Sequence, residues 1–221
     1  MNQLPTVTKH LLIWNVLFFM GAAVASKYGF DIDKYLGLHF FLASDFRLYQ
    51  FFTYMFMHSG FGHIFFNMFA VWMFGRILEN TWGPKRFLML YLVCGIGAGI
   101  IQEGVQYIHY IIELSRYEYV SMAGISLPMG EYLNMLNTVG ASGAVYGILL
   151  GYAMTYPDQP LFIIPFPFPI KAKWLVTGYI VLEIIMGLSN RPGDNVAHFA
   201  HLGGMLFAYL LIRHWRRKGF Y

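Results

Sequence analysis

The chain has 221 residues, of which 57% are hydrophobic and only 12% are charged. A soluble domain carries about 25% charged residues, so this composition excludes an ordinary water-soluble fold and indicates an integral membrane protein. The net charge of +4 does not indicate nucleic-acid binding, because the basic residues gather at the ends of apolar runs. The single cysteine, Cys94, excludes an intramolecular disulfide and a cysteine-rich zinc site. We expect one domain over residues 1–221.

Six apolar runs approach the roughly 20 residues that a helix needs to cross a bilayer. They predict an all-α fold, a polytopic membrane helical bundle with six transmembrane helices. The expected spans cover residues 8–26, 59–78, 86–106, 141–156, 172–189 and 196–214.

The basic residues divide unequally between the two faces that this pattern of spans defines. Positive charge concentrates on the cytoplasmic side of membrane proteins, which places both termini in the cytoplasm. That side receives Lys9, Arg76, Lys85, Arg86, Lys171, Lys173, Arg213, Arg216, Arg217 and Lys218. The other side receives Lys27, Lys34, Arg47, Arg116 and Arg191.

The first span has a second interpretation, as a secretory signal peptide. Lys9 precedes the apolar run, and Ala23-Val24-Ala25 before Ser26 is typical of a cleavage site. Cleavage would leave five spans, whereas the later charges fit six. We therefore favour a membrane span.

The stretches between the spans are irregular. Residues between the first two spans are rich in aromatic side chains, which favour the membrane interface: Phe40, Phe41, Phe46, Tyr49, Phe51, Phe52 and Tyr54. Residues 107–139 are expected to form an interfacial helix and a loop. Prolines from Pro157 to Pro169 predict a connection that is not helical throughout, and residues 191–194 predict a tight turn.

Small residues recur on two of the spans at helical spacing. Gly143, Gly147 and Gly151 lie on one helix face, and Gly204 and Ala208 form a second such face on the last span. Small residues let membrane helices approach closely. These stripes predict that the fourth and sixth spans pack backbone to backbone.

Ser142 stands at the start of the glycine stripe. A serine in a span often bonds only to its own helix backbone. However, His201 lies three residues before Gly204 and shares its face, so the predicted seam brings the imidazole to the hydroxyl. A serine becomes nucleophilic when a base takes its proton. We favour His201 over His198 as this base, because His201 lies one turn deeper in the span.

His63 and Asn67 are four residues apart on the second span and share one helix face. Both side chains can donate hydrogen bonds to an oxyanion. They could equally hold two helices together by hydrogen bonds.

These residues together resemble the rhomboid family of intramembrane serine proteases, of the bacterial six-span type, from about residue 47 to 210. The matching motifs are His63-x-x-x-Asn67, Gly140-Ala141-Ser142-Gly143, Tyr146, and Ala200-His201-x-x-Gly204.

The resemblance implies a Ser142–His201 dyad without a third acid. It also implies an oxyanion hole from the amides of Ala141 and Ser142 with His63 and Asn67, and a Tyr146 that packs under His201. The family often has Trp-Arg before the second span. Here Tyr49-Gln50 stands in that place, with Arg47 upstream.

We therefore expect a serine endopeptidase of a bacterial inner membrane that cuts single-span or polytopic membrane proteins in or near their transmembrane segments. We expect no cofactor, metal or nucleic acid, and the zinc-protease signature H-E-x-x-H is absent from the sequence. The alternatives are an inactive relative that binds membrane segments and, less favoured, a small transporter with Glu183 as its relay.

Overall fold

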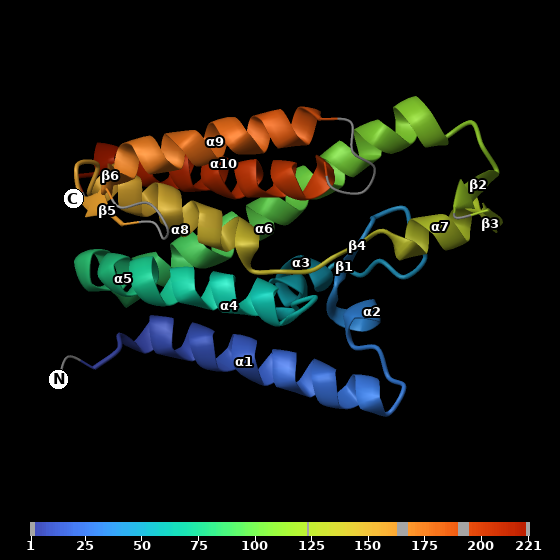
Figure 1. The fold of residues 1–221 in the computed structure, drawn as a ribbon, viewed down its shortest axis with the longest axis horizontal. Coiled ribbons are helices and arrows are strands. Elements are labelled where there is room, and N and C mark those ends of the chain that lie inside the picture. The colour runs from blue at the N-terminus through green and yellow to red at the C-terminus, as the bar shows by residue number, and fades with distance from the viewer. Residues whose placement is uncertain (1–2, 123, 163–167, 190–194, 220–221) are drawn as a thin grey trace.

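The computed structural model describes residues 3–122, 124–162, 168–189 and 195–219. The fold is mostly helical, and Figure 1 shows the long helices side by side along one direction. The helices that run along the bundle are α1 (Thr6–Lys27), α4 (Phe61–Ala70), α5 (Arg76–Trp82), α6 (Pro84–His109), α8 (Ser142–Thr155), α9 (Ala172–Leu188) and α10 (Asn195–Arg217). The start of α1 and the end of α10 lie at the same end of the bundle (Figure 1).

Each predicted span coincides with a helix to within a few residues. A π-helical turn at Val71–Gly75 joins α4 to α5, so that Phe61–Trp82 is one continuous helical segment. Within the described residues, three helices are long and apolar enough to cross a membrane: Thr6–Lys27, Phe61–Trp82 and Pro84–Leu114. This composition is that of an integral membrane protein.

Helix α1 packs against the rest of the bundle through polar and apolar contacts. The backbone N–H and the hydroxyl of Thr8 both donate to the carboxylate of Glu79 on α5, at 2.7 and 2.8 Å. Leu11 is buried in the main apolar core. These contacts tie the first helix to the second membrane segment.

Short elements lie between the long helices. The short helices are α2 (Asp33–Leu36), α3 (Gln50–Thr53) and α7 (Met129–Met135), with a 3₁₀ turn at Tyr54–Phe56. The strands form antiparallel pairs: β1 (Leu38–His39) with β4 (Asn137–Thr138), β2 (Tyr119–Met122) with β3 (Ile125–Pro128), and β5 (Pro160–Leu161) with β6 (Ile170–Lys171). The β1–β4 pair joins two connecting stretches that are far apart in sequence.

The expected interfacial helix after residue 107 is wrong. Helix α6 instead continues through a π-helical turn at Tyr110–Leu114, which makes one segment of 31 residues. At 1.5 Å per residue it is about 46 Å long, well beyond the roughly 30 Å hydrocarbon core. Its end therefore projects past the other helices before the β2–β3 hairpin and α7 begin (Figure 1).

The proline-rich connection is not helical where it is described, and its ends pair as β5 and β6. Pro165 and Pro167, and the turn expected at residues 191–194, lie outside the described residues.

The aromatic stretch before α4 is divided between the protein interior and its surface. Phe40 and Tyr54 are buried, and the Tyr54 hydroxyl donates to the carbonyl of Gly95 at 2.6 Å. Phe41 and Phe52 are exposed. The segment is thus anchored in the protein by some rings, while others are free to meet the headgroup region.

Gln50, the second residue of the Tyr49-Gln50 pair before the second span, anchors this connecting stretch. Its side chain is fully buried, and its amide nitrogen donates to the carbonyl of Asp45 at 3.1 Å. Its carbonyl oxygen accepts the backbone N–H of Arg47 at 2.9 Å. A neutral amide therefore does the anchoring here.

The small-residue stripes form close contacts, but with a different first neighbour than expected. A methyl group on Gly204 would overlap the backbone carbonyl of Gly143, so α10 and α8 do meet backbone to backbone. A methyl group on Gly147 would instead overlap Cys94 of α6 first, and one on Gly143 would overlap Ala98. The glycine stripe therefore serves mainly the α6–α8 contact.

We expect Gly204→Ala to lower the free energy of unfolding by about 1 to 3 kcal/mol, because a backbone carbonyl cannot move aside as a flexible side chain can. Thermal unfolding in detergent measures this effect. Gly178→Ala is the matched control, since Gly178 of α9 has open space where the methyl group would lie. Equal melting temperatures for the two variants would show that α8 and α10 do not meet at Gly204.

Candidate active site

Ser142 is the first residue of α8, directly after a bend that needs glycine. Gly140 has φ +134°, which residues with side chains rarely adopt. A methyl group there would also lie 2.7 Å from ring atoms of His63. The Gly140 N–H donates to the carbonyl of Tyr54 at 2.9 Å, which fixes the bend. The local sequence thus sets the position of the Ser142 hydroxyl.

His201 of α10 lies next to this hydroxyl. Its Nε2 atom is 2.9 Å from Ser142 Oγ, although the residues are 59 positions apart. The close approach of Gly204 to Gly143 brings these two helices together one turn further along. The two side chains that the sequence pairs therefore lie within hydrogen-bond distance.

The ring of Tyr146 stacks on the His201 ring, with centroids 4.1 Å apart and planes inclined by 7°. Tyr146 is one turn after Ser142 on α8, so the same helix presents the hydroxyl and supports the imidazole. The Tyr146 hydroxyl donates to Glu183 Oε1. This contact ties α8 to α9.

Glu183 of α9 lies against the other side of His201, a neighbour that the expected Ser142–His201 dyad did not include. Its Oε2 atom is 3.1 Å from His201 Nδ1, an ion-pair distance. The same oxygen is 2.6 Å from His198 Nδ1. The sequence marks Glu183 as an unusual acid within a span, but it does not indicate which helix the carboxylate faces.

The same cluster is the one in the described residues that could hold a metal ion. Glu183, His198 and His201 each offer a ligand atom, and these atoms lie within 4.8 Å of one another. In the structure they contact each other directly, with the carboxylate between the two imidazoles.

His63 of α4 approaches the same region from another helix, and Asn67 lies one turn further along α4. His63 borders the space beside Gly140, and its Nδ1 atom lies 3.1 Å from Ser59 Oγ. Asn67 is buried, and its Nδ2 atom has no hydrogen-bond partner among the described residues. A buried amide without a partner is costly, so a donor is available here for a ligand.

His58 packs beside His63, with ring centroids 5.0 Å apart. Burial, followed by the neighbouring His63, lowers the pKa of His58 to about 4. It is therefore neutral near pH 7. Neither of its ring nitrogens has a hydrogen-bond partner within the described part of the chain.

The amides of Ala141 and Ser142 stand where α8 begins. The first amides of a helix have no acceptor within their own helix, and they carry the positive end of its dipole. These two amides, His63 and Asn67 are the four groups that the family resemblance implies for an oxyanion hole.

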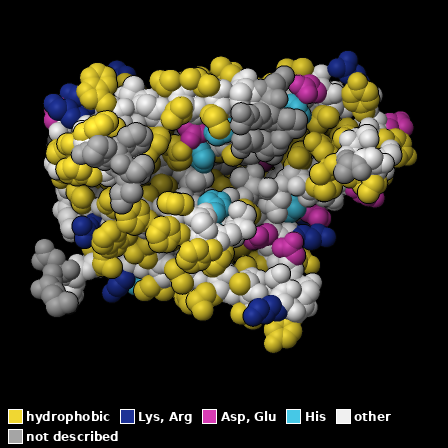
Figure 2. All heavy atoms as spheres, viewed as in Figure 1, with side chains coloured by type: hydrophobic (Ala, Val, Ile, Leu, Met, Phe, Trp, Pro, Cys, Tyr) yellow, Lys and Arg dark blue, Asp and Glu magenta, His cyan; other side chains and the backbone are white. Residues whose placement is uncertain are grey.

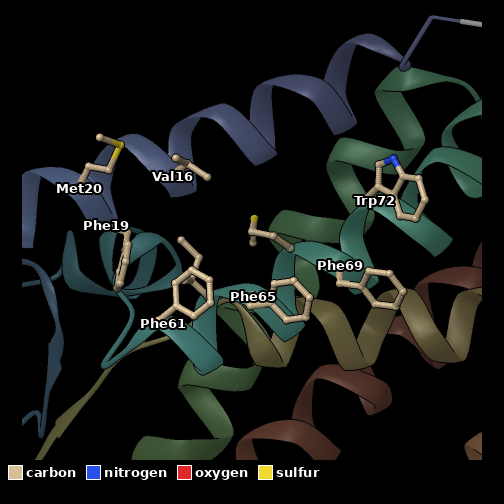
Figure 3. Close-up of a pocket in the computed structure, with 9 residues that line it drawn as sticks. Val16, Phe19, Met20, Phe61, Phe65, Phe69 and Trp72 are labelled. Carbon is tan, nitrogen blue, oxygen red and sulfur yellow. The ribbon is translucent and has the colours of Figure 1, made fainter. Parts of the chain in front are cut away.

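Histidine side chains border a hollow in the middle of one face of the molecule, which is otherwise largely hydrophobic (Figure 2). A second feature is an apolar pocket of about 450 Å³ between α1 and α4. Figure 3 shows its aromatic lining, including Phe61, Phe65 and Trp72. None of the candidate catalytic residues lines this pocket.

Comparison with known proteins places the chain in a family. The Rhomboid domain model matches residues 45–217. The chain is 28% identical over 169 residues to Rhomboid protease AarA of Providencia stuartii, which covers 72% of this chain and 55% of AarA.

Two further relatives come from eukaryotes. Rhomboid-like protein 11, chloroplastic, of Arabidopsis thaliana is 25% identical over 232 residues, covering 96% of this chain and 67% of the relative. Rhomboid protein 1, mitochondrial, of Saccharomyces cerevisiae is 28% identical over 155 residues, covering 70% and 38%. The chain thus spans about half the length of AarA and less of the yeast protein. With the family model matching more than half of its residues, this membrane protein belongs to the rhomboid family.

Proposed function

We propose that this chain is an intramembrane serine protease in which Ser142 is the nucleophile and His201 the general base. The observation that carries the proposal is the 2.9 Å contact between Ser142 Oγ and His201 Nε2, within a protein of the rhomboid family. The alternative of an inactive relative that only binds membrane segments does not require this contact.

The proposed organisation of the chain is one domain with six transmembrane helices. Helices α8, α9 and α10, of 14, 17 and 23 residues, lie alongside the three helices that are long and apolar enough to cross a membrane (Figure 1). Since α1 starts and α10 ends at the same end of the bundle, both termini lie on one side, which we assign to the cytoplasm of a bacterial cell.

In the proposed mechanism, Ser142 Oγ attacks the carbonyl carbon of a substrate peptide bond. His201 Nε2 takes the hydroxyl proton and gives it to the leaving amine as the C–N bond breaks, which leaves an acyl-enzyme on Ser142. Water then attacks the acyl carbon, His201 takes its proton, and the acyl–oxygen bond breaks to return the proton to Ser142. The negative oxygen of the tetrahedral intermediate receives hydrogen bonds from the amides of Ala141 and Ser142, from His63 and from Asn67. Donors held in place before the reaction stabilise this charge more than mobile ones do.

The substrates are proposed to be transmembrane segments of other membrane proteins. A substrate helix hides its peptide bonds within its own hydrogen bonds, so it must unwind before Ser142 can attack. We therefore expect cleavage near the external face, at segments with small or helix-weakening residues. The direct test is cleavage of a single-span substrate by the purified chain in liposomes, which Ser142→Ala must abolish.

We expect His63→Ala and Asn67→Ala to lower turnover by about 100- to 1000-fold each, the usual cost of losing one oxyanion donor. Labelling of the serine should change less, because a strongly reactive probe depends less on these donors. Steady-state cleavage and labelling of the same preparations measure both effects.

Phe66→Ala is the control on the same helix, since Phe66 is 71% exposed. If His63→Ala and Asn67→Ala instead unfold the protein while the folded fraction keeps full turnover, the two residues only join helices.

A further inference from the structure

Glu183 carries a carboxylate on a membrane helix, where a charged group is costly and needs a specific reason. The residue is 7% exposed. Its two oxygens contact side chains from two other helices, Tyr146 from α8 and both His198 and His201 from α10. All of these contacts lie around the proposed general base.

The two ring nitrogens of His201 face different partners. Nε2 is 2.9 Å from Ser142 Oγ, and Nδ1 is 3.1 Å from Glu183 Oε2. The order hydroxyl, imidazole and carboxylate is the one in which serine hydrolases of unrelated folds arrange nucleophile, base and acid. Here three separate helices, α8, α10 and α9, supply the three groups.

We propose that Glu183 is a positioning residue that orients the His201 ring through Nδ1. Ser142, His201 and Glu183 then form a row in which each side chain contacts the next. This inference rests on the proposed protease function. Glu183 touches neither substrate nor the attacking oxygen, and it acts only through the imidazole.

The chemistry requires a particular proton arrangement on His201. A neutral imidazole carries one proton, and only the form protonated at Nδ1 has a lone pair at Nε2 to accept the Ser142 proton. Among the described residues Nδ1 has no partner of hydrogen-bond geometry, but the Glu183 carboxylate lies 3.1 Å away. Its negative charge attracts the proton on Nδ1, and a small rotation of the ring would form the hydrogen bond, so the carboxylate favours this form. When Nε2 takes the serine proton, the imidazole becomes positive and the carboxylate, which stays ionised, stabilises it.

The carboxylate is itself held from two sides. The Tyr146 hydroxyl donates to Oε1, and His198 Nδ1 lies 2.6 Å from Oε2. Tyr146 therefore serves twice, because its ring also stacks on the His201 ring. The titratable groups that face Glu183 are these two histidines and Tyr146, with Tyr179 of α9 packed against the Tyr146 ring. His198 thus contacts the Glu183 carboxylate. From its spacing in the sequence alone, it was a second candidate for the general base.

The test compares Glu183→Gln with Glu183→Asp in the full chain in detergent or liposomes. Glutamine keeps the size of the side chain but loses the charge, and its amide can donate to Nδ1 and reverse the proton arrangement. We expect kcat to fall by about 100- to 10,000-fold with KM changed by no more than about threefold. Glu183→Asp keeps the charge and should recover a large part of kcat.

Glu103→Gln is the matched control. Glu103 is also a buried acid on a membrane helix, but its carboxylate accepts the backbone N–H of Phe41, away from the site. Its turnover should remain that of the wild type. Equal kcat for Glu183→Gln and wild type, with both folded, would overturn the inference.

A second readout does not depend on proteolysis. Nitrogen NMR of histidine-labelled protein at about pH 8, where an ordinary imidazole is neutral, reports which ring nitrogen carries the proton. The His201 signal is identified by its loss in His201→Ala. We expect protonated Nδ1 in the wild type and a shift toward protonated Nε2 in Glu183→Gln.

The two readouts separate the two hypotheses. If the chain cleaves no substrate but Glu183→Gln still shifts the proton from Nδ1 to Nε2, the positioning role stands and the protease function is rejected. If the chain cleaves substrate but the position of the His201 proton is the same in Glu183→Gln and wild type, the protease function stands and the positioning role is rejected.

Discussion

Replacing Ser142 with alanine is expected to abolish cleavage of a single-span substrate, by about 10⁴- to 10⁶-fold in kcat. The variant loses the attacking oxygen, and no other hydroxyl is placed against His201 Nε2 in the described structure. The fold should be unaffected, because the change removes one oxygen from a half-buried site and leaves α8 intact.

Purified wild type and Ser142→Ala in matched liposomes provide the measurement, with thermal unfolding as the control for folding. Cleavage by Ser142→Ala at the wild-type rate would show that another group, or a contaminating protease, performs the reaction.

His201→Ala is expected to reduce cleavage to a similar extent and to remove serine labelling as well, because an unactivated hydroxyl reacts poorly. His198→Ala should keep a measurable part of both activities. His198 contacts Glu183, whereas His201 contacts Ser142 directly. Its loss therefore weakens the hold on the carboxylate but leaves the base in place.

Initial rates of cleavage and of labelling for the two variants, each corrected for its folded fraction, make this comparison. If His198→Ala is inactive while His201→Ala cleaves substrate and is labelled, His198 is the base.

The positions of the helices could be predicted because each span is a long apolar run with charged or irregular residues at its ends. The contact of Ser142 with His201 could also be anticipated, since small residues next to each of them allow a close approach. The first signal lies within single segments of sequence, and the second lies in matching small-residue patterns on two segments.

The surroundings of Glu183 could not be predicted in the same way. The residue comes from α9, and its contacts depend on how α9 is rotated relative to α8 and α10. Spacing within one helix does not determine that rotation. The glycine stripe illustrates the same limit, because small residues indicate close packing without naming the neighbour, here mainly α6 for Gly147.

The connecting stretches were the least predictable part. Residues 107–114 are mixed in character and read as an interfacial helix, but they continue α6 without a break. The pairing of β1 with β4 joins residues about a hundred positions apart. Such pairings depend on where the helices bring the chain ends, which local patterns do not contain.

Labelling with a fluorophosphonate probe tests most directly whether Ser142 is a nucleophile activated by His201. The probe reacts with an activated serine and leaves a covalent mass on it, which mass spectrometry assigns to one peptide. We expect the wild-type protein in liposomes to be modified at Ser142 and nowhere else, and His201→Ala to remain unmodified. If Ser142 is modified in His201→Ala at the wild-type rate, or if the folded wild type is not modified, Ser142 is not a nucleophile activated by His201.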